Sequence, residues 1–192
     1  VDEVQVVRRS RRRFLVIATT PGGLRILHFS ASNESATPAT LTLNSDQFYP
    51  TLQGDELCTT MAAHDRLVVG FRDDTTSRLR VVTFRVVSSG PSILHDNTSD
   101  TGRIHAGTSL MTLGRYGVCF AVRTETDDGK LLFYRLAPSG ITRRVADSGG
   151  AIGPIKRHHA LADAGSVVGD DIVLVCGNDD GKLRVMGFRY TS

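Results

Sequence analysis

Apolar residues recur along the chain in paired short runs that are separated by polar or glycine-containing turns. The second run of each pair has the pattern Leu-x-apolar-x-x-Phe/Leu, and its copies begin at Leu24, Leu79, Leu131 and Leu183. The copies are 52 to 55 residues apart, and the apolar runs that precede them begin at residues 14, 67, 118 and 172. Alternation of apolar and polar residues within the runs favours strands over helices, so each pair predicts a β-hairpin.

Two weaker strands are expected to flank each hairpin. The strand before it is predicted at "VQVV" from Val4, "LCTTMA" from Leu57, "SLMTL" from Ser109 and "HALAD" from His159. The strand after it is predicted from a signature of Asp or Asn, five residues, Gly or Pro, one residue and Leu or Ile, which begins at Asn44, Asp96 and Asp147. Each repeat therefore holds four antiparallel strands, here called A to D in chain order, except the last repeat, which stops at strand C.

Four antiparallel strands in units of about 52 residues, without helical periodicity, predict an all-β fold of the β-propeller class. A sheet with two apolar faces cannot bury both of them alone, so neighbouring sheets are expected to stack around an axis. We expect a single domain, 1–192, with blades at approximately 1–52, 53–104, 105–155 and 156–192. The last blade lacks its outer strand in this prediction.

The stretch "AVRTETDDGKLLFYRL" at 121–136, followed by "ITRRVADSGGAIGPI" at 141–155, resembles bacterial-type propeller repeats. In those repeats an Ala-Val-Arg-Thr strand leads into a Gly-Lys-Leu strand and then an Asp-Ser-Gly crossing. The "DDGKL" turn is also similar to blades of the quinoprotein-like propellers. This resemblance implies the fold alone, since propellers serve many functions. The chain has no tryptophan, so it departs from the quinoprotein type and from Trp-lined lectin propellers, and a quinone cofactor is not implied.

The incomplete last blade has three explanations, which the sequence leaves open. The chain is a piece of a longer protein, two copies complete one eight-bladed ring as a homodimer, or four blades close into a ring with one three-stranded member. An unpaired sheet edge is an aggregation hazard, which propellers close by exchanging strands between their first and last blades. The first two explanations are favoured over the third.

Composition is that of a folded, soluble protein, with 40% hydrophobic and 22% charged residues. No apolar run approaches the length needed to cross a bilayer, so we do not expect a membrane-spanning protein. Whether the protein is secreted or cytoplasmic is not indicated. Cys58, Cys119 and Cys176 lie in strand-like apolar runs without a CxxC pair. We therefore expect buried thiols rather than a disulfide framework or a zinc site.

One short run, "RRSRRR", accounts for the positive net charge of +3 and contains Arg8, Arg9, Arg11, Arg12 and Arg13. Such a basic patch is typical of a surface that binds nucleic acid, heparin or acidic lipid, or of a protease processing site. No aromatic platform or second basic stripe accompanies it, which argues against nucleic acid as the partner. A solvated turn is the favoured interpretation.

Acidic residues gather in the predicted turns between strands B and C, and the candidate ligand-binding residues there are Asp127, Asp128, Asp179 and Asp180. Clustered carboxylates suit calcium, which prefers hard oxygen ligands. No loop has the alternating Asp-x-Asp-x-Asp-Gly spacing that surrounds one ion, and Asp-Gly is also what a tight hairpin turn requires. We therefore expect no cofactor, with calcium as the minor alternative.

Candidate residues also stand near the starts of the A strands, where Asp55 and Glu56 form an acidic pair and His105 and His159 lie in or beside the crossings. A pair of carboxylates is the minimum for glycoside hydrolysis, so this pair motivates an alternative function as a propeller-type glycoside hydrolase or lyase. A similar acidic pair stands at Asp2 and Glu3. Recurrence at equivalent positions is what an inherited structural feature would also show, and no catalytic residue is assigned.

The favoured prediction is a non-enzymatic interaction module that presents one propeller face to a protein or glycan ligand. Repeated sites without a single set of catalytic residues suit multivalent recognition. Aromatic residues make up only 6% of the chain, which disfavours strong stacking on sugars. The expected contacts are therefore with a protein or with the polar groups of a glycan.

Overall fold

The computed structural model describes residues 1–32, 40–63, 65–113, 117–137, 139, 142–148, 152–155, 159–163, 170–177 and 182–190. Every regular element in this part of the chain is a β-strand. Unit 1 is the sheet β1 (Glu3–Ser10), β2 (Arg13–Thr20), β3 (Gly23–Ala31) and β4 (Leu41–Tyr49). Unit 4 is the sheet β12 (His159–Asp163), β13 (Asp170–Gly177) and β14 (Leu183–Tyr190).

A seven-stranded sheet lies between these two and contains units 2 and 3. Its strands are β5 (Gly54–Ala63), β6 (Arg66–Asp73), β7 (Arg78–Val87), β8 (Gly90–Leu113), β9 (Gly117–Thr124), β10 (Gly129–Leu136) and β11 (Thr142–Asp147). The first part of β8 pairs with β7 and its second part pairs with β9. One long strand therefore serves as strand D of unit 2 and strand A of unit 3. Gly102, with φ of +85°, lies where the two parts meet.

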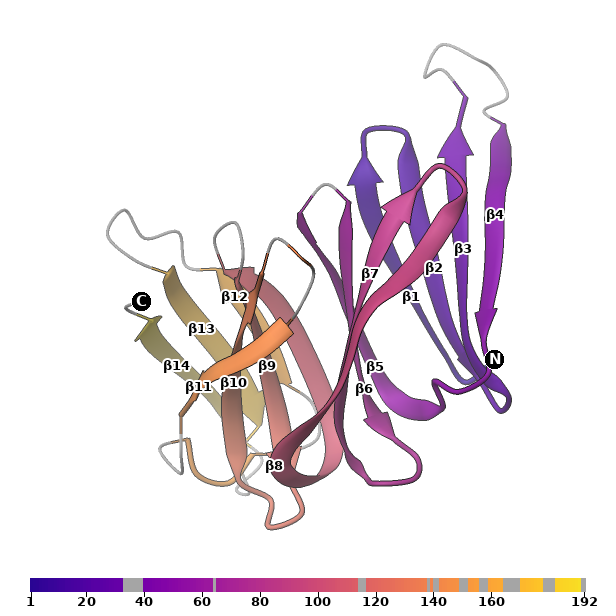
Figure 1. The fold of residues 1–192 in the computed structure, drawn as a ribbon. Helices are drawn as coiled ribbons and strands as arrows, with labels where there is room; N and C mark the ends of the chain where they lie inside the picture. Colours follow the sequence, from indigo (N-terminus) through magenta and orange to yellow (C-terminus); the bar gives the residue numbers. More distant parts are fainter. Residues whose placement is uncertain are drawn as a thin grey trace.

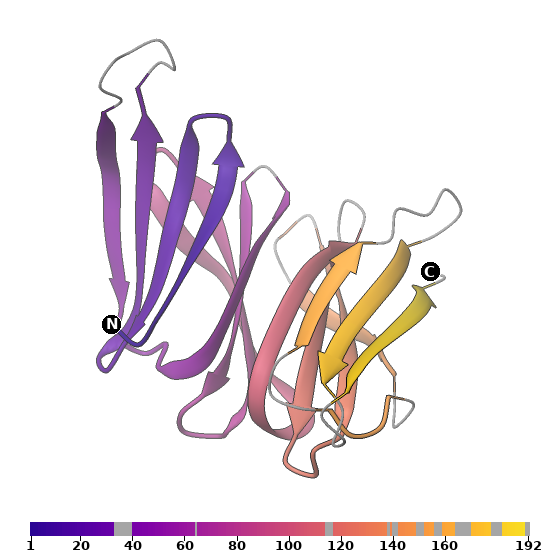
Figure 2. The ribbon, with the colours of Figure 1, turned by 180° about the vertical axis from the view of Figure 1, so that it is seen from behind.

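The sheets stand side by side in a row, with unit 1 at one end and unit 4 at the other (Figures 1 and 2). All neighbouring strands within a unit are antiparallel. The turns β2–β3, β6–β7 and β9–β10 and the D-to-A crossings consequently share one edge, the lower edge in Figure 1, here called the turn end. The β1–β2 turn lies at the opposite edge.

Three hydrophobic clusters fill the spaces between successive units. Strand β6 shows how one sheet serves two of them, because successive side chains on a strand point to opposite faces. Leu67, Val69 and Phe71 belong to the cluster shared with unit 1, and Val68 belongs to the cluster shared with unit 3. All four are at most 1% exposed. The sheets stack face to face, as the apolar alternation predicts.

The D strands differ from the prediction. The strand predicted to begin at Asp147 is wrong, because β11 ends at that residue. The strand predicted to begin at Asn44 begins three residues earlier, as β4. The signature marks the end of strand D and the following crossing instead. Its last residue, Leu52, Ile104 or Ile155, is in each case 1% exposed and belongs to the cluster that the next unit shares. These three apolar residues anchor the crossings between units.

The hairpins and the A strands agree with the prediction, including β12, which begins at His159 and ends at Asp163 as "HALAD" indicates. In the described part of unit 4 the sheet has strands A, B and C only. Cys58, Cys119 and Cys176 are buried and free, as expected. The blade boundaries stay a prediction. None of the described residues belongs to a helix that is long and apolar enough to cross a bilayer.

Candidate functional site at the turn end

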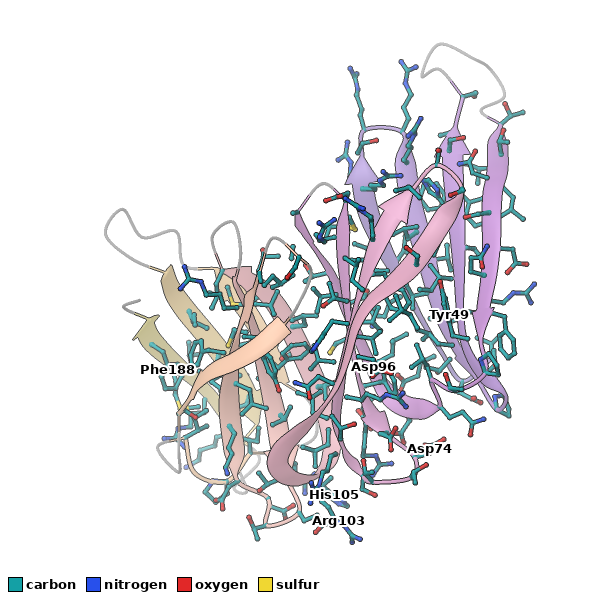
Figure 3. The ribbon with its side chains drawn as sticks, in the orientation of Figure 1. Tyr49, Asp74, Asp96, Arg103, His105 and Phe188 are labelled. Atoms are coloured by element: carbon teal, nitrogen blue, oxygen red, sulfur yellow. The ribbon has the colours of Figure 1, made fainter. Side chains whose placement is uncertain are left out.

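Polar side chains from units 2 and 3 meet at the turn end. Figure 3 shows Asp74, Arg103 and His105 along this edge, contributed by the β6–β7 turn and by the middle of β8. All three are exposed. The guanidinium of Arg103 lies 3.5 Å from the carboxylate of Glu125 in the β9–β10 turn. The edge therefore presents both acidic and basic groups to solvent.

Arg72 connects two of the predicted site residues. Its Nε donates to Asp55 Oδ1 at 2.7 Å and its Nη2 donates to Asp55 Oδ2, so the pair is bidentate. Its Nη1 donates to the backbone carbonyl oxygen of His105 at 2.7 Å. The hydrogen bonds with Asp55 raise the pKa of Arg72. Arg72 therefore binds the neighbouring strand and the next crossing.

Glu56 has a backbone role. Its φ is +56°, and it lies where the pairing of β5 with β6 shifts register between Asp55 and Cys58. The Glu3 carboxylate of unit 1 accepts from the backbone N–H groups of Glu56, at 3.1 Å, and of Leu57. The hydroxyl of Thr108 in unit 3 donates to the Glu56 carbonyl oxygen. The β5 bulge at Glu56 thus joins three successive units.

Asp73 at the end of β6 is built into its turn. Its carboxylate accepts from the N–H groups of Thr75 and Thr76, from the Thr76 hydroxyl and from Arg80 Nη1 at 3.0 Å. Burial raises the pKa of Asp73, but the hydrogen bonds from Thr76 and Arg80 outweigh it, and the pKa is lowered. Arg80 also pairs with Asp96 and donates to the carbonyl oxygen of Thr51 in the preceding crossing.

The acidic residues of the β9–β10 turn are likewise held by their neighbours. Asp127, with φ of +65°, accepts from Arg123 Nη2 at 2.6 Å, an ion pair across this turn. Asp128 accepts from the hydroxyl of Thr126 at 3.0 Å. The Asp127 carbonyl oxygen also accepts from the N–H of Ile155 in the following crossing. These contacts give the turn a structural role.

The remaining predicted site residues do not join this cluster in the part of the chain that the structure describes. Asp179 and Asp180 lie outside the described residues. His159 is paired through its backbone with Cys176 in β13. Within the described residues, no three His, Cys, Asp or Glu side chains are placed to hold a metal ion.

The arginine run forms the β1–β2 hairpin, at the edge opposite the turn end. Arg8, Arg11, Arg12 and Arg13 are exposed. Arg9 points toward unit 2, where its Nη2 donates to the carbonyl oxygen of Val86 at 2.8 Å. The five arginines therefore lie in one hairpin, but Arg9 contacts unit 2 whereas the other four are exposed to solvent.

Arg80 was missed as a key residue in the sequence, although a signal for it exists. Arginine follows the first leucine of the hairpin motif in three repeats, at Arg25, Arg80 and Arg184. Arg184 Nη1 donates to the Ile152 carbonyl oxygen at 2.7 Å, as Arg80 does to that of Thr51. In units 2 and 4 the recurring Leu-Arg pair thus marks a contact with the crossing of the preceding unit.

Comparison with known proteins identifies the fold class. No family model and no curated protein sequence matches the chain. Among solved structures, a variant of Aleuria aurantia lectin in complex with Fucα1-6GlcNAc matches with a TM-score of 0.59 and 11% identity, over 97% of this chain and 58% of the lectin chain. The same lectin with α-methyl-L-fucoside gives a TM-score of 0.58 and 12% identity, over 97% and 57% of the two chains. These lectins are β-propellers, and the chain has this fold.

Proposed function

We propose that the chain is a non-enzymatic glycan-binding module, with a sugar site at the turn end beside Arg72 and His105. The chain spans 58% of the length of the lectin that it resembles, and structures of that lectin hold Fucα1-6GlcNAc or α-methyl-L-fucoside. The observation that carries the proposal is the position of Arg72, which pairs with Asp55 in unit 2 and donates to His105 in the crossing to unit 3, and so joins two predicted site residues. The similar fold supports the choice of a glycan over a protein ligand.

The chemistry of the site suits the hydroxyl groups of a sugar. A guanidinium has five N–H donors in a fixed plane, and Asp55 and the His105 carbonyl oxygen accept from three of them in the described contacts. Two donors are left for a ligand, and the Arg72 side chain is 30% exposed. Because Asp55 fixes the plane in advance, little rotamer entropy remains to be lost on binding.

The geometry gives the alternative hydrolase less support. Glycoside hydrolysis requires two carboxyl groups, one of which is a general acid or base that faces the substrate. Both oxygens of Asp55 accept from Arg72, and the backbone at Glu56 joins neighbouring units. We therefore assign Asp55 a positioning role, in which it orients Arg72, and the proposal contains no bond-breaking step.

The test is a glycan array followed by titration calorimetry with the sugars that are retained. Substitution Arg72→Ala should weaken binding by about 10-fold to 100-fold, the value of one or two hydrogen bonds to a charged group. The matched control is Arg12→Ala, an exposed arginine at the opposite edge, which should bind as the unchanged protein does. Circular dichroism checks that both variants fold. Retention of no glycan, or equal affinity of Arg72→Ala, would contradict the proposal.

A turnover assay separates binding from hydrolysis. The protein is incubated with a panel of aryl glycosides that represent the sugars retained on the array. We expect no release of the aryl group above the rate in buffer. Release that disappears in Asp55→Asn while the sugar still binds would establish the hydrolase in place of the binding module.

A further inference from the structure

The two outer sheets of the row each have one face that no described residue covers. In each unit we call the side toward the previous unit the preceding face and the other side the following face. The preceding face of unit 1 carries Val4 and Val6, which are 53% and 63% exposed. The following face of unit 4 carries Leu183 and Val185, which are 75% and 61% exposed. These two faces lie at opposite ends of the row (Figures 1 and 2).

The preceding face of unit 1 has the composition of an internal face. Strand pairing places Val4, Val6, Leu43 and Phe48 on the same side as the central residues of the sheet, and these central residues are Phe14, Val16, Ala18, Leu27 and Phe29. The repeat places the five central residues in register with positions of unit 2 that are at most 1% exposed, namely Leu67, Val69, Phe71, Val82 and Phe84. The rings of Phe14 and Phe29 stack on this face at 5.3 Å.

The following face of unit 4 has the same property. Leu183 and Val185 correspond to Leu131 and Phe133 in unit 3, which are 0% and 8% exposed, because unit 4 covers them. In units 1 and 2 the corresponding pairs, Leu24 with Ile26 and Leu79 with Val81, are fully buried. These two positions of strand C are buried in every unit that has a following unit beside it.

A polar contact repeats in the same way. Arg80 and Arg184 each donate to a carbonyl oxygen of the preceding crossing. Arg25 holds the equivalent place on the preceding face of unit 1, oriented by a bidentate pair with Asp46, and its side chain is 51% exposed. Unit 1 therefore carries both the apolar residues and the oriented arginine that unit 2 uses to bind its neighbour.

We propose that the following face of unit 4 in one copy packs on the preceding face of unit 1 in a second copy. Each of the three internal clusters joins a following face to a preceding face, so this contact repeats a packing that the chain already makes three times. The chain covers only 58% of the similar lectin chain, which agrees with a row that is too short to bring its own ends together. Association is head to tail, and two copies close it with two identical contacts.

The test is light scattering of the purified chain over a range of concentrations. We expect a mass of twice 20.8 kDa, which falls to that of one chain in Val6→Glu and in Val185→Glu. Both valines are exposed within one copy, so the variants should fold. Val87→Glu is the matched control, since Val87 is 37% exposed in unit 2 and lies outside both faces. It should keep the mass of the unchanged protein.

Mixing the two variants tests the head-to-tail arrangement. Val6→Glu keeps an intact face on unit 4, and Val185→Glu keeps an intact face on unit 1. An equimolar mixture should therefore regain a two-chain species through one contact, although neither variant does so alone. A monomer at every concentration would overturn the proposal. Dimers that persist in Val185→Glu alone would overturn the head-to-tail contact.

Discussion

Gly70 shows how tightly the sheets approach one another. A Cβ atom at this position in β6 would lie 2.2 Å from the ring of Phe120 in unit 3 and 3.0 Å from the sulfur of Cys58. Phe120 is fully buried and has no room to move away. We expect Gly70→Val to lower the free energy of unfolding by about 1–3 kcal/mol, the usual cost of overpacking a core. Urea unfolding followed by circular dichroism measures this change.

Gly187 provides the control for that substitution. It also lies within a strand, but nothing stands within 4 Å of a Cβ placed there, and the residue is exposed. Measured in the Val185→Glu monomer, Gly187→Val should unfold at the same urea concentration as Val185→Glu alone or at a higher one, because valine suits strands better than glycine. Equal losses in the two variants would show that the approach of Phe120 is not the cause.

Asp73 makes the stability of the protein depend on pH. The pKa of Asp73 is lowered in the folded protein. The ionised carboxylate therefore stabilises the fold at pH values above its pKa in the unfolded chain, about 3.9, and this stabilisation is lost as the pH falls through its lower pKa in the folded protein. Asp73→Asn should therefore flatten the decline of stability below about pH 4. Urea midpoints between pH 5 and pH 2 measure the slope. A slope in Asp73→Asn equal to that of the unchanged protein would contradict this role of Asp73.

At the scale of elements, Arg80 joins three segments that belong to two units. It contacts Asp73 in the turn, Asp96 in β8 and the Thr51 carbonyl oxygen in the crossing, and its side chain is 17% exposed. Arg80→Ala should lower the free energy of unfolding by about 3 kcal/mol, because two carboxylates lose their partner. Chemical unfolding at pH 7 measures it.

Arg25→Ala is the matched control for Arg80→Ala. The two arginines hold equivalent places in the repeat, but the Arg25 side chain is 51% exposed and no described residue of a preceding unit lies beside it. The unfolding midpoint of a single copy should hardly change, and measuring it in the Val185→Glu background removes any effect of association. If Arg25→Ala lowers the free energy of unfolding as much as Arg80→Ala does, the ion pair with the aspartate of strand D is the dominant contact, and the hydrogen bond to the crossing is not.

The elements that the sequence predicted well are those with two apolar faces. The β6–β7 and β9–β10 hairpins were placed correctly because their strands are buried on both sides and their turns carry Asp or Gly. The D strands were misplaced because the signature used to find them marks their ends and the following crossings rather than their starts. The signature at Asp147 was informative for a different reason, since its final Ile155 fills the core beneath a crossing.

The candidate site was only partly predictable. Asp55 and His105 stood out as polar residues near strand starts, but the arginine that joins them could be assigned only from the strand register. The pairing of β5 with β6 shifts register between Asp55 and Cys58, and no sequence pattern marks this shift. Asp127 and Arg123 were predictable as a pair because they are four residues apart on either side of one turn.

At the scale of the whole molecule, the three hydrophobic clusters of the described residues each join two successive units, so the stack is a row of nearest-neighbour contacts. In such arrays the end units open more readily than the internal ones. Unit 4 has three described strands and one uncovered face, whereas unit 2 is covered on both faces. We therefore expect unit 4 to be the least stable part of a single copy.

Two of the buried cysteines report this gradient. Cys58 lies between units 2 and 3, and Cys176 lies between units 3 and 4. Burial raises the pKa of Cys58 to about 12 and also raises that of Cys176, so a thiol reagent at pH 8 reacts only after local opening. Peptide mapping by mass spectrometry should find Cys176 labelled about tenfold faster than Cys58 in the Val185→Glu monomer. Equal labelling rates of the two cysteines would mean that all units open together in one cooperative step. The reference is the urea-unfolded protein, in which the two rates should be the same.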